Sequence, residues 1–254
     1  MKALEPAWGR TSRFYLPNED AAAIRSALGA LDALPENPVF VGGSGMVLLE
    51  AARMLSPAAS SRYVDIAAFQ CAYFRRLRDA LAGCATPAAL RRWFARKVYP
   101  EMRGHFLARG REYALPQVWR ALRDIFRCRF FFEQGAFLAA RSAAGRALAA
   151  REDIAVWLAG ARTRHDFIYL SNVPDYLDPE KAEVLFAACA LHRAPTYVAL
   201  TSACADQPAA HAAWRAAGFA PHACCGRLNA LNRGLGSALR RDWNRPGEIF
   251  LLLP

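Results

Sequence analysis

The chain of 254 residues has no long apolar run and no apolar signal core at its start. No stretch approaches the roughly 20 apolar residues that a membrane-spanning helix needs. Residues 1–6 mix charged residues and proline with apolar ones, unlike the apolar core of a secretion signal. We therefore expect no transmembrane segment and a cytoplasmic location.

Paired cysteine motifs are also missing. The seven cysteines form no CxxC pair and no zinc-ligand spacing, and stand at positions 71, 84, 128, 189, 204, 224 and 225. A scattered, odd set without a secretion signal indicates reduced cysteines in the core. The sequence also shows no metal-ligand cluster and no Ser/His/Asp constellation with supporting context. We therefore expect no metal. We interpret His165 as structural, and His105 is the histidine better suited to a functional role.

Acidic residues are few, with 22 against 33 lysines and arginines, so the formal net charge is +11. The basic residues concentrate between 75 and 129. Such an excess suits nucleic acid, an anionic membrane, an acidic partner, or solubility alone. Because no nucleic-acid-binding signature accompanies it, we expect no nucleic acid. Anionic lipid, an acidic carrier protein or no partner at all remain open.

What the sequence does contain is a nucleotide-binding βαβ pattern between residues 38 and 70. An apolar run at 39–41 leads into Gly42-Gly43-Ser44-Gly45, and a helical pattern follows over 46–55. A second apolar run at 63–64 ends in Asp65. Glycines allow a tight bend and close approach to a ligand. A carboxylate about 20 residues further on suits a pair of ribose hydroxyls.

Strands and helices alternate along the rest of the chain. The sequence predicts strands at 130–132, ending in Glu133, and at 166–170, 196–201, 222–230 and 247–253. It predicts helices at 20–33, 136–162, 179–192 and 209–217. Alternation indicates an α/β fold with a doubly wound, mostly parallel seven-stranded sheet. We expect the last two strands to form an antiparallel hairpin, which argues against a dehydrogenase fold.

Three units follow from this pattern. Residues 1–37 form an N-terminal lid with one helix, and residues 38–83 with 129–254 form the nucleotide-binding, Rossmann-like body. Residues 84–128 are basic, aromatic and mostly helical. A connection of this length is far longer than usual, so we interpret it as an inserted helical lid.

This order of parts resembles the class I S-adenosylmethionine-dependent transferases. The glycine turn, Asp65, Glu133 and Ser171-Asn172 fall at positions that this family uses after its first four strands. The chain is most similar to the 3-amino-3-carboxypropyl transferases of betaine-lipid synthesis. The shared residues are Glu19-Asp20, Asp65 with Gln70, Ser171-Asn172-Val173-Pro174-Asp175-Tyr176 and, more loosely, Arg241-Asp242. The chain has Ala67-Ala68 where that family has Asn-Pro.

The resemblance implies S-adenosylmethionine as donor substrate and methylthioadenosine as leaving group. It implies that the backbone of Gly42, Gly43, Ser44 and Gly45 contacts the donor, that Asp65 binds the ribose, and that Glu133 or Gln134 meets the adenine or ribose. Ile66, Gln70, Ser171 and Asn172 complete the donor site. Asn172, Asp175, Tyr176 and Tyr15 are the predicted catalytic residues, with Tyr15 closing over the donor.

Several functions remain open from the sequence. The acceptor is a small molecule or a lipid, or it is absent if the donor cyclises on itself to a small cyclic amino acid. Methyl transfer to a small molecule is the next alternative. An NAD-dependent dehydrogenase and a non-catalytic nucleotide-binding module are the remaining ones.

Overall fold

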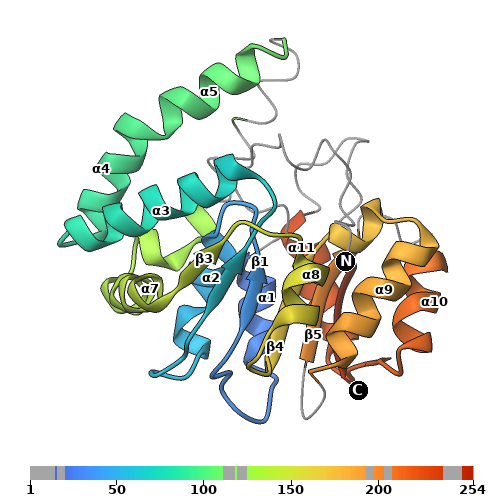
Figure 1. Cartoon of the computed structure of the whole chain (residues 1–254). Coiled ribbons are helices and arrows are strands. Elements are labelled where there is room, and N and C mark those ends of the chain that lie inside the picture. Colours follow the sequence, from blue (N-terminus) through green and yellow to red (C-terminus); the bar gives the residue numbers. More distant parts are fainter. Residues whose placement is uncertain are drawn as a thin grey trace.

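One seven-stranded sheet organises the computed structural model, in the order β3-β2-β1-β4-β5-β7-β6 (Figure 1). The structure describes residues 15, 21–110, 118, 125–192, 197–202, 208–236 and 248–253. The strands are β1 Val39–Val41, β2 Arg62–Val64, β3 Leu148–Ala150, β4 Phe167–Ser171, β5 Tyr197–Ser202, β6 Ala220–Pro221 and β7 Glu248–Leu253.

Strands β1 to β5 are parallel, whereas β7 runs antiparallel to both β5 and β6. The order reverses between β1 and β4, which pair with each other. The predicted fold class is therefore confirmed: the sheet is open, doubly wound and mostly parallel, with antiparallel pairing of β7 near one edge. This is the class I methyltransferase-like arrangement.

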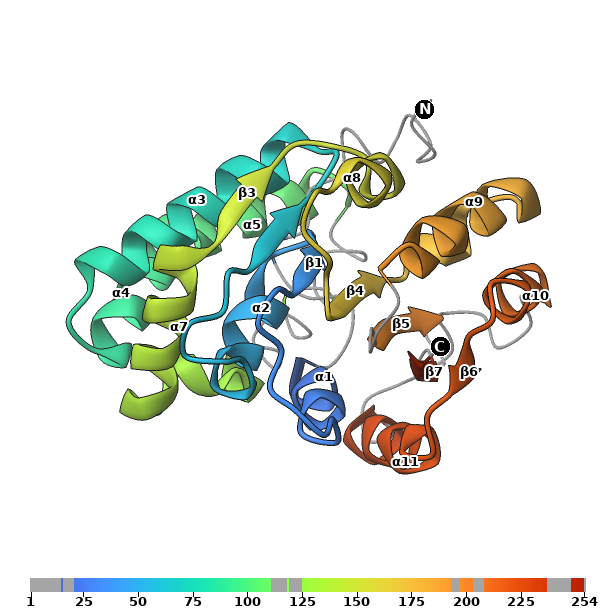
Figure 2. The same ribbon diagram turned by 60° about the horizontal axis from the view of Figure 1, so that its bottom comes forward.

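Helices cover both faces of the sheet (Figure 2). Side chains alternate between these faces along each strand: Phe40 packs into one buried cluster, while Val39 and Val41 pack into the other. The first face carries α1 Ala21–Leu28, α2 Met46–Ala51, α3 Ala68–Gly83, α7 Gln134–Arg146 and α11 Cys225–Gly236. The second carries α8 Ile154–Gly160, α9 Pro179–Ala190 and α10 Pro208–Ala216.

Aspartates begin two of the helices on the second face. The Asp153 carboxylate accepts from the Ala155 amide at 2.9 Å, and Asp178 accepts from the Lys181 amide at 2.9 Å. Each cap satisfies a backbone donor that lacks a partner within the helix. Pro179, as predicted, occupies the first turn of α9, where its missing N–H costs nothing.

The predicted third strand is wrong. Residues 129–131 form a short 3₁₀ turn, η3 Arg129–Phe131, and Glu133 precedes helix α7. Phe130 and Phe131 are both fully buried, whereas Phe132 is 40% exposed. An apolar run this short fits a buried turn as well as a strand, because periodicity cannot separate them. The third strand of the sheet is β3, which lies about one helix further along the chain.

The predicted strand at 222–230 is also wrong, because most of this stretch is helix α11. Cys224 and Leu228 are buried four residues apart, which places them on one helical face. Strand β6 is only two residues long, and it pairs antiparallel with β7. The expected antiparallel edge is thus present, but a helix connects its two strands.

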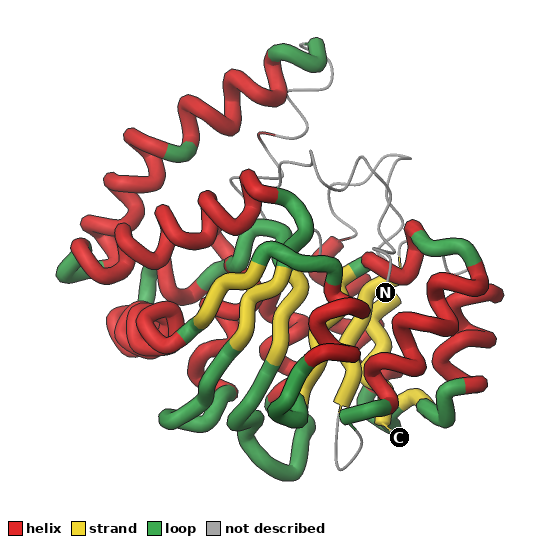
Figure 3. Tube along the Cα trace, in the orientation of Figure 1, coloured by secondary structure: helices red, strands yellow, loops and turns green. Residues whose placement is uncertain are grey.

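The connection between β2 and β3 contains α3, then α4 Pro87–Lys97 and α5 Tyr99–Leu107, then η3 and α7. Figure 3 shows α4 and α5 as a rod that rises away from the sheet. The division of the chain into lid, body and insertion stays a prediction. The motif residues Glu19-Asp20 and Arg241-Asp242 lie outside the described part. Within that part, no helix combines the length and the apolar character that crossing a membrane requires.

Candidate functional site

The segments that follow β1, β2, β3 and β4 meet at the carboxyl edge of the sheet. Val41 pairs with Val64, Val64 pairs with Ala150, and Phe40 pairs with Tyr169. Because these strands are parallel and adjacent, the glycine turn lies between Asp65 and the Ser171 segment. The two segments expected to hold one ligand therefore emerge side by side.

The glycine turn bends sharply after β1. The Gly42 amide still donates to the Val64 carbonyl at 2.8 Å, and the Gly45 amide donates back to the Gly42 carbonyl at 3.2 Å. Gly43 and Gly45 have φ of 57° and 73°. A side chain is strained in this left-handed region. Helix α2 begins directly after Gly45, so its first amides face the carboxyl edge.

Asp65 folds back over this turn. Its Oδ2 accepts from the Gly43 amide at 3.0 Å, and its Oδ1 accepts from the Ala67 amide at 2.7 Å. A Cβ at Gly42 would lie 1.7 Å from Oδ2, so only glycine leaves room for the carboxylate there. Burial raises the pKa of Asp65 from 3.8 to about 6, although the two amides lower it.

A buried layer supports the turn from below. The Tyr63 hydroxyl donates to the Gly43 carbonyl at 2.9 Å, and the Gln70 side-chain amide donates to the same oxygen. The Tyr63 ring stacks on Phe74 with centroids 4.2 Å apart, and a Cβ at Gly45 would lie 2.4 Å from Phe74. Gln70 is fully buried, so the structure places it beneath the turn. Sequence reasoning missed Tyr63 and Phe74.

Two further predicted donor contacts lie within the turn region. Ser44 is 1% exposed, and its hydroxyl accepts from the Met46 amide at 3.3 Å. Ile66 is 8% exposed, and its carbonyl accepts from the Arg151 guanidinium at 3.5 Å. Their backbones thus lie beside Gly43 and Asp65, while their side chains are covered.

The end of β4 is distorted. The pairing of β4 with β5 shifts register between Tyr169 and Ser171, and Ser171 has a φ of 52°. A non-glycine residue held in this region is strained, and such positions cluster at functional sites. The Asn172 side-chain amide donates to the Tyr176 hydroxyl at 3.0 Å across the turn η4 Val173–Tyr176. Asp175 lies within this turn.

Tyr15 lies between α3 and α5. It is 2% exposed, and its ring packs edge-on against Phe69 and Tyr73 with centroids 5.3 and 5.7 Å away. Its hydroxyl donates to Glu101 at 3.1 Å, and the Tyr73 hydroxyl donates to the Tyr15 carbonyl at 3.1 Å. The structure thus brings Tyr15 to the first two turns of α3, with its hydroxyl bound to Glu101 of α5.

Glu133 and Gln134 do not join the other predicted residues. Glu133 is exposed and lies 3.9 Å from Arg53 in η2 Ala52–Met54, which continues α2 at its far end from the glycine turn. Gln134 is exposed at the start of α7. Their assignment to the end of a strand is wrong because the segment before them is a turn.

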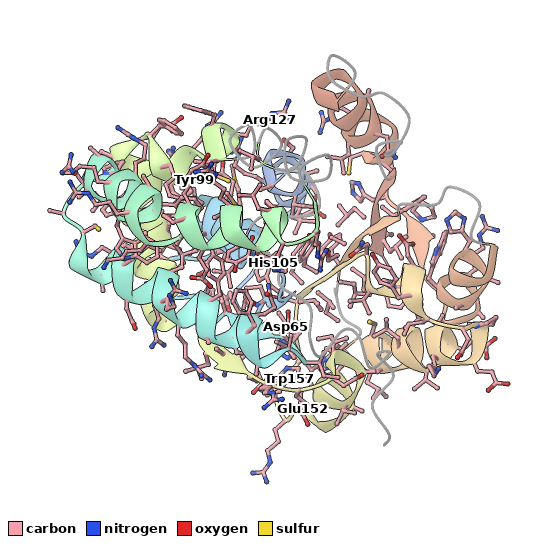
Figure 4. The ribbon with its side chains drawn as sticks, turned by 90° about the horizontal axis from the view of Figure 1, so that it is seen from above. Asp65, Tyr99, His105, Arg127, Glu152 and Trp157 are labelled. Atoms are coloured by element: carbon pink, nitrogen blue, oxygen red, sulfur yellow. The ribbon has the colours of Figure 1, made fainter. Side chains whose placement is uncertain are left out.

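Glu152 occupies the position after the third strand. It is the second residue after β3 ends, and its amide donates to the Asp65 carbonyl at 3.2 Å. In Figure 4, which looks down on the molecule from above, Asp65 and Glu152 are labelled at the carboxyl edge, and His105 of α5 is labelled near Asp65 in this view. Sequence reasoning missed Glu152 because Leu148-Ala149-Ala150 carries little β propensity. The His105 ring packs against the Tyr15 ring, with the two ring centroids 5.9 Å apart.

No family model and no curated protein matches the chain. Solved structures with a similar fold include the magnesium protoporphyrin IX methyltransferase of Synechocystis PCC 6803 with bound SAM, with 12% identity, a TM-score of 0.45, and coverage of 92% of this chain and 77% of that one. A SAM-dependent methyltransferase from Leishmania major has 9% identity to this chain and a TM-score of 0.48. The match covers 92% of this chain and 71% of that one. The glycopeptide N-methyltransferase MtfA has 10% identity and a TM-score of 0.47. The match covers 92% of this chain and 94% of that one. Likenesses this distant do not assign an activity.

Proposed function

We propose that the chain is a transferase that binds S-adenosylmethionine at the carboxyl edge of its sheet. One observation carries the proposal: the Asp65 carboxylate is held over Gly42 and against the Gly43 amide, where the strand order reverses between β1 and β4. In open α/β sheets, ligands bind outside the carboxyl ends of the strands at this reversal.

In this proposal the ribose hydroxyls donate to Asp65, which is ionised at neutral pH because its pKa is about 6. The backbone of residues 42–45 faces the donor. Glu152, rather than Glu133, is assigned to the adenine side, because its backbone amide is bound to the Asp65 carbonyl. The amino-acid tail points toward Asn172 and Asp175, which follow the neighbouring strand β4.

In this proposal the group transferred from S-adenosylmethionine is its 3-amino-3-carboxypropyl arm. The lone pair of a nucleophile attacks the γ-carbon, the carbon–sulfur bond breaks, and its electron pair neutralises the sulfonium, so that methylthioadenosine leaves. Asp175 accepts the nucleophile's proton. The Tyr176 ring faces the sulfonium, a contact that favours cations. The resemblance at 171–176 supports this choice.

If the donor's own α-amine is the nucleophile, no second substrate is needed and a small cyclic amino acid forms. If a separate acceptor is used, it is a small molecule or a lipid. Methyl transfer is the second candidate, because the observed sheet order is the methyltransferase-like one. The antiparallel β7 disfavours a dehydrogenase.

Incubation with S-adenosylmethionine alone, followed by mass spectrometry, separates these reactions. Release of methylthioadenosine with a cyclic amino acid supports intramolecular arm transfer. Methylthioadenosine formed only with an added acceptor supports intermolecular arm transfer, and S-adenosylhomocysteine identifies methyl transfer. Titration calorimetry with S-adenosylmethionine and with NADH separates a transferase from a dehydrogenase. Binding of neither ligand would overturn the proposal.

A further inference from the structure

The segment from α3 to the end of α5 carries much of the positive charge of the chain. Residues 68–110 contain nine basic and two acidic residues, a net +7 of the formal +11 of the whole chain. Of the two acids, Glu101 already pairs with Arg76 at 2.9 Å, and Asp79 lies beside Arg78. This segment therefore presents a strong, nearly uncompensated positive field.

The two helices continue one another. Val98 between them keeps right-handed helical dihedrals, its amide donates to the Phe94 carbonyl, and its carbonyl accepts from the Met102 amide, both at 2.9 Å. Leu90, Phe94, Val98 and Met102 are at most 4% exposed. A spacing of four residues puts them on one helical face, which packs against the body.

Three arginines occupy the opposite face. Arg92, Arg96 and Arg103 fall within about 40° of one another around a helix of 3.6 residues per turn, and all three are exposed. None of the three forms an ion pair with any residue of the described part. We call them the arginine stripe. Figure 1 shows that the rod carrying them projects from the molecule.

The residues around the stripe have an unusual composition. Every exposed residue between 87 and 110 is basic, apolar or glycine; they are Arg92, Ala95, Arg96, Lys97, Pro100, Arg103, Gly104, Leu107, Ala108, Arg109 and Gly110. No exposed serine, threonine, asparagine or glutamine is among them. Nucleic-acid surfaces commonly combine arginine and lysine with such side chains to contact phosphate and sugar, so this composition favours lipid over RNA or DNA.

Exposed arginines and lysines that cluster on a helix are attracted to the negative surface of an anionic bilayer. Leu107 is 42% exposed at the end of the rod, and Phe126 and Phe132 are 69% and 40% exposed beside its beginning, where Arg91 lies 4.8 Å above the Phe132 ring. From this charge and composition we propose that the arginine stripe docks the protein on an anionic lipid bilayer. The proposal is independent of the donor site.

The test is sedimentation with phosphatidylcholine vesicles that contain or lack phosphatidylglycerol. The wild type should sediment only with the anionic vesicles, and high salt should release it because salt screens exposed charges. Each arginine near such a surface contributes about a fivefold factor in binding. The variant Arg92→Glu/Arg96→Glu/Arg103→Glu should therefore bind at least about 100-fold more weakly.

A matched variant controls for net charge. Arg141, Arg162 and Arg227 are exposed arginines outside the rod. Their reversal to glutamate changes the net charge by the same amount and should leave vesicle binding within a few-fold of the wild type. Equal loss in both variants, equal binding to neutral vesicles, or binding of polyuridylate in place of vesicles would each overturn the proposal. Unchanged circular dichroism shows that both variants fold.

Discussion

At the scale of single residues, the site depends on glycine positions that leave room for one carboxylate. Gly42 and Gly43 adjoin each other but differ in their surroundings. A Cβ at Gly42 would collide with Asp65, whereas a Cβ at Gly43 would meet nothing within 4 Å. The two positions therefore make a matched pair for testing whether the carboxylate position matters.

We expect Gly42→Ala to displace Asp65 and to weaken S-adenosylmethionine binding by at least about tenfold, since it breaks a charge-assisted hydrogen bond. Gly43→Ala leaves the carboxylate its room, since a Cβ there meets nothing within 4 Å in the structure, and adds the strain of a left-handed residue, about 1–2 kcal/mol of folding stability. Calorimetric titration of both variants checks this. Equal affinity of Gly42→Ala and the wild type would refute the steric argument.

The titration of Asp65 gives a second prediction. Its pKa is raised to about 6, and only the ionised carboxylate accepts hydrogen bonds from both ribose hydroxyls. Donor affinity should thus be constant above about pH 7 and fall by up to about tenfold per pH unit below pH 6. Affinity measured from pH 5 to 8 reports this. The Asp65→Asn variant should bind S-adenosylmethionine weakly, with an affinity nearly independent of pH. If its affinity fell with pH as that of the wild type does, the effect would belong to another group.

At the scale of elements, two buried histidines join α8, α9 and the start of β4. The Trp157 indole donates to His165 Nε2 at 3.3 Å, and His165 Nδ1 lies 2.9 Å from the Asn37 carbonyl. The His165 amide donates to His192 Nδ1, and His192 Nε2 lies 3.0 Å from the Leu158 carbonyl. Each ring is thus neutral, with one nitrogen donating and one accepting. The sequence-based interpretation of His165 as structural fits these contacts.

Acid should therefore loosen this junction. Burial lowers the pKa of both His165 and His192 below the ordinary 6.5, so the unfolded chain binds protons more readily than the folded one. Stability should fall as the pH decreases below about 6.5, and level off only below the lowered folded pKa values. Scanning calorimetry checks whether the melting temperature falls between pH 7.5 and 5.5. The double variant His165→Gln/His192→Gln should show a smaller fall; an equal fall would contradict the assignment.

The elements also show where sequence patterns suffice. The glycine turn, Asp65 and β4 were predicted because their signals are local: glycines before a helix, an acid after a strand, and a run of β-forming residues. Strand β3 was missed because Leu148-Ala149-Ala150 has no such signal, and pairing with β2 makes it a strand. The run at 130–132 was misassigned because core packing, rather than local preference, sets its conformation.

At the scale of the whole molecule, sheet order brings distant segments to one edge. Residues 42–45, 65–66, 152 and 171–176 adjoin because β1, β2, β3 and β4 are neighbours in the sheet. The doubly wound, mostly parallel fold class could be predicted from the alternation of strands and helices, whereas two of the seven strands could not. The placement of Tyr15 between α3 and α5, and of Glu133 beside Arg53, could not, because tertiary packing alone determines both.

The central claim is that Asp65 holds the ribose of S-adenosylmethionine at the glycine turn. Calorimetric titration of S-adenosylmethionine into the wild type and Asp65→Ala measures it directly. Losing two charge-assisted hydrogen bonds should weaken binding by about 100-fold, with the melting temperature measured as a control for folding. A folded Asp65→Ala protein that binds S-adenosylmethionine as tightly as the wild type would contradict the claim.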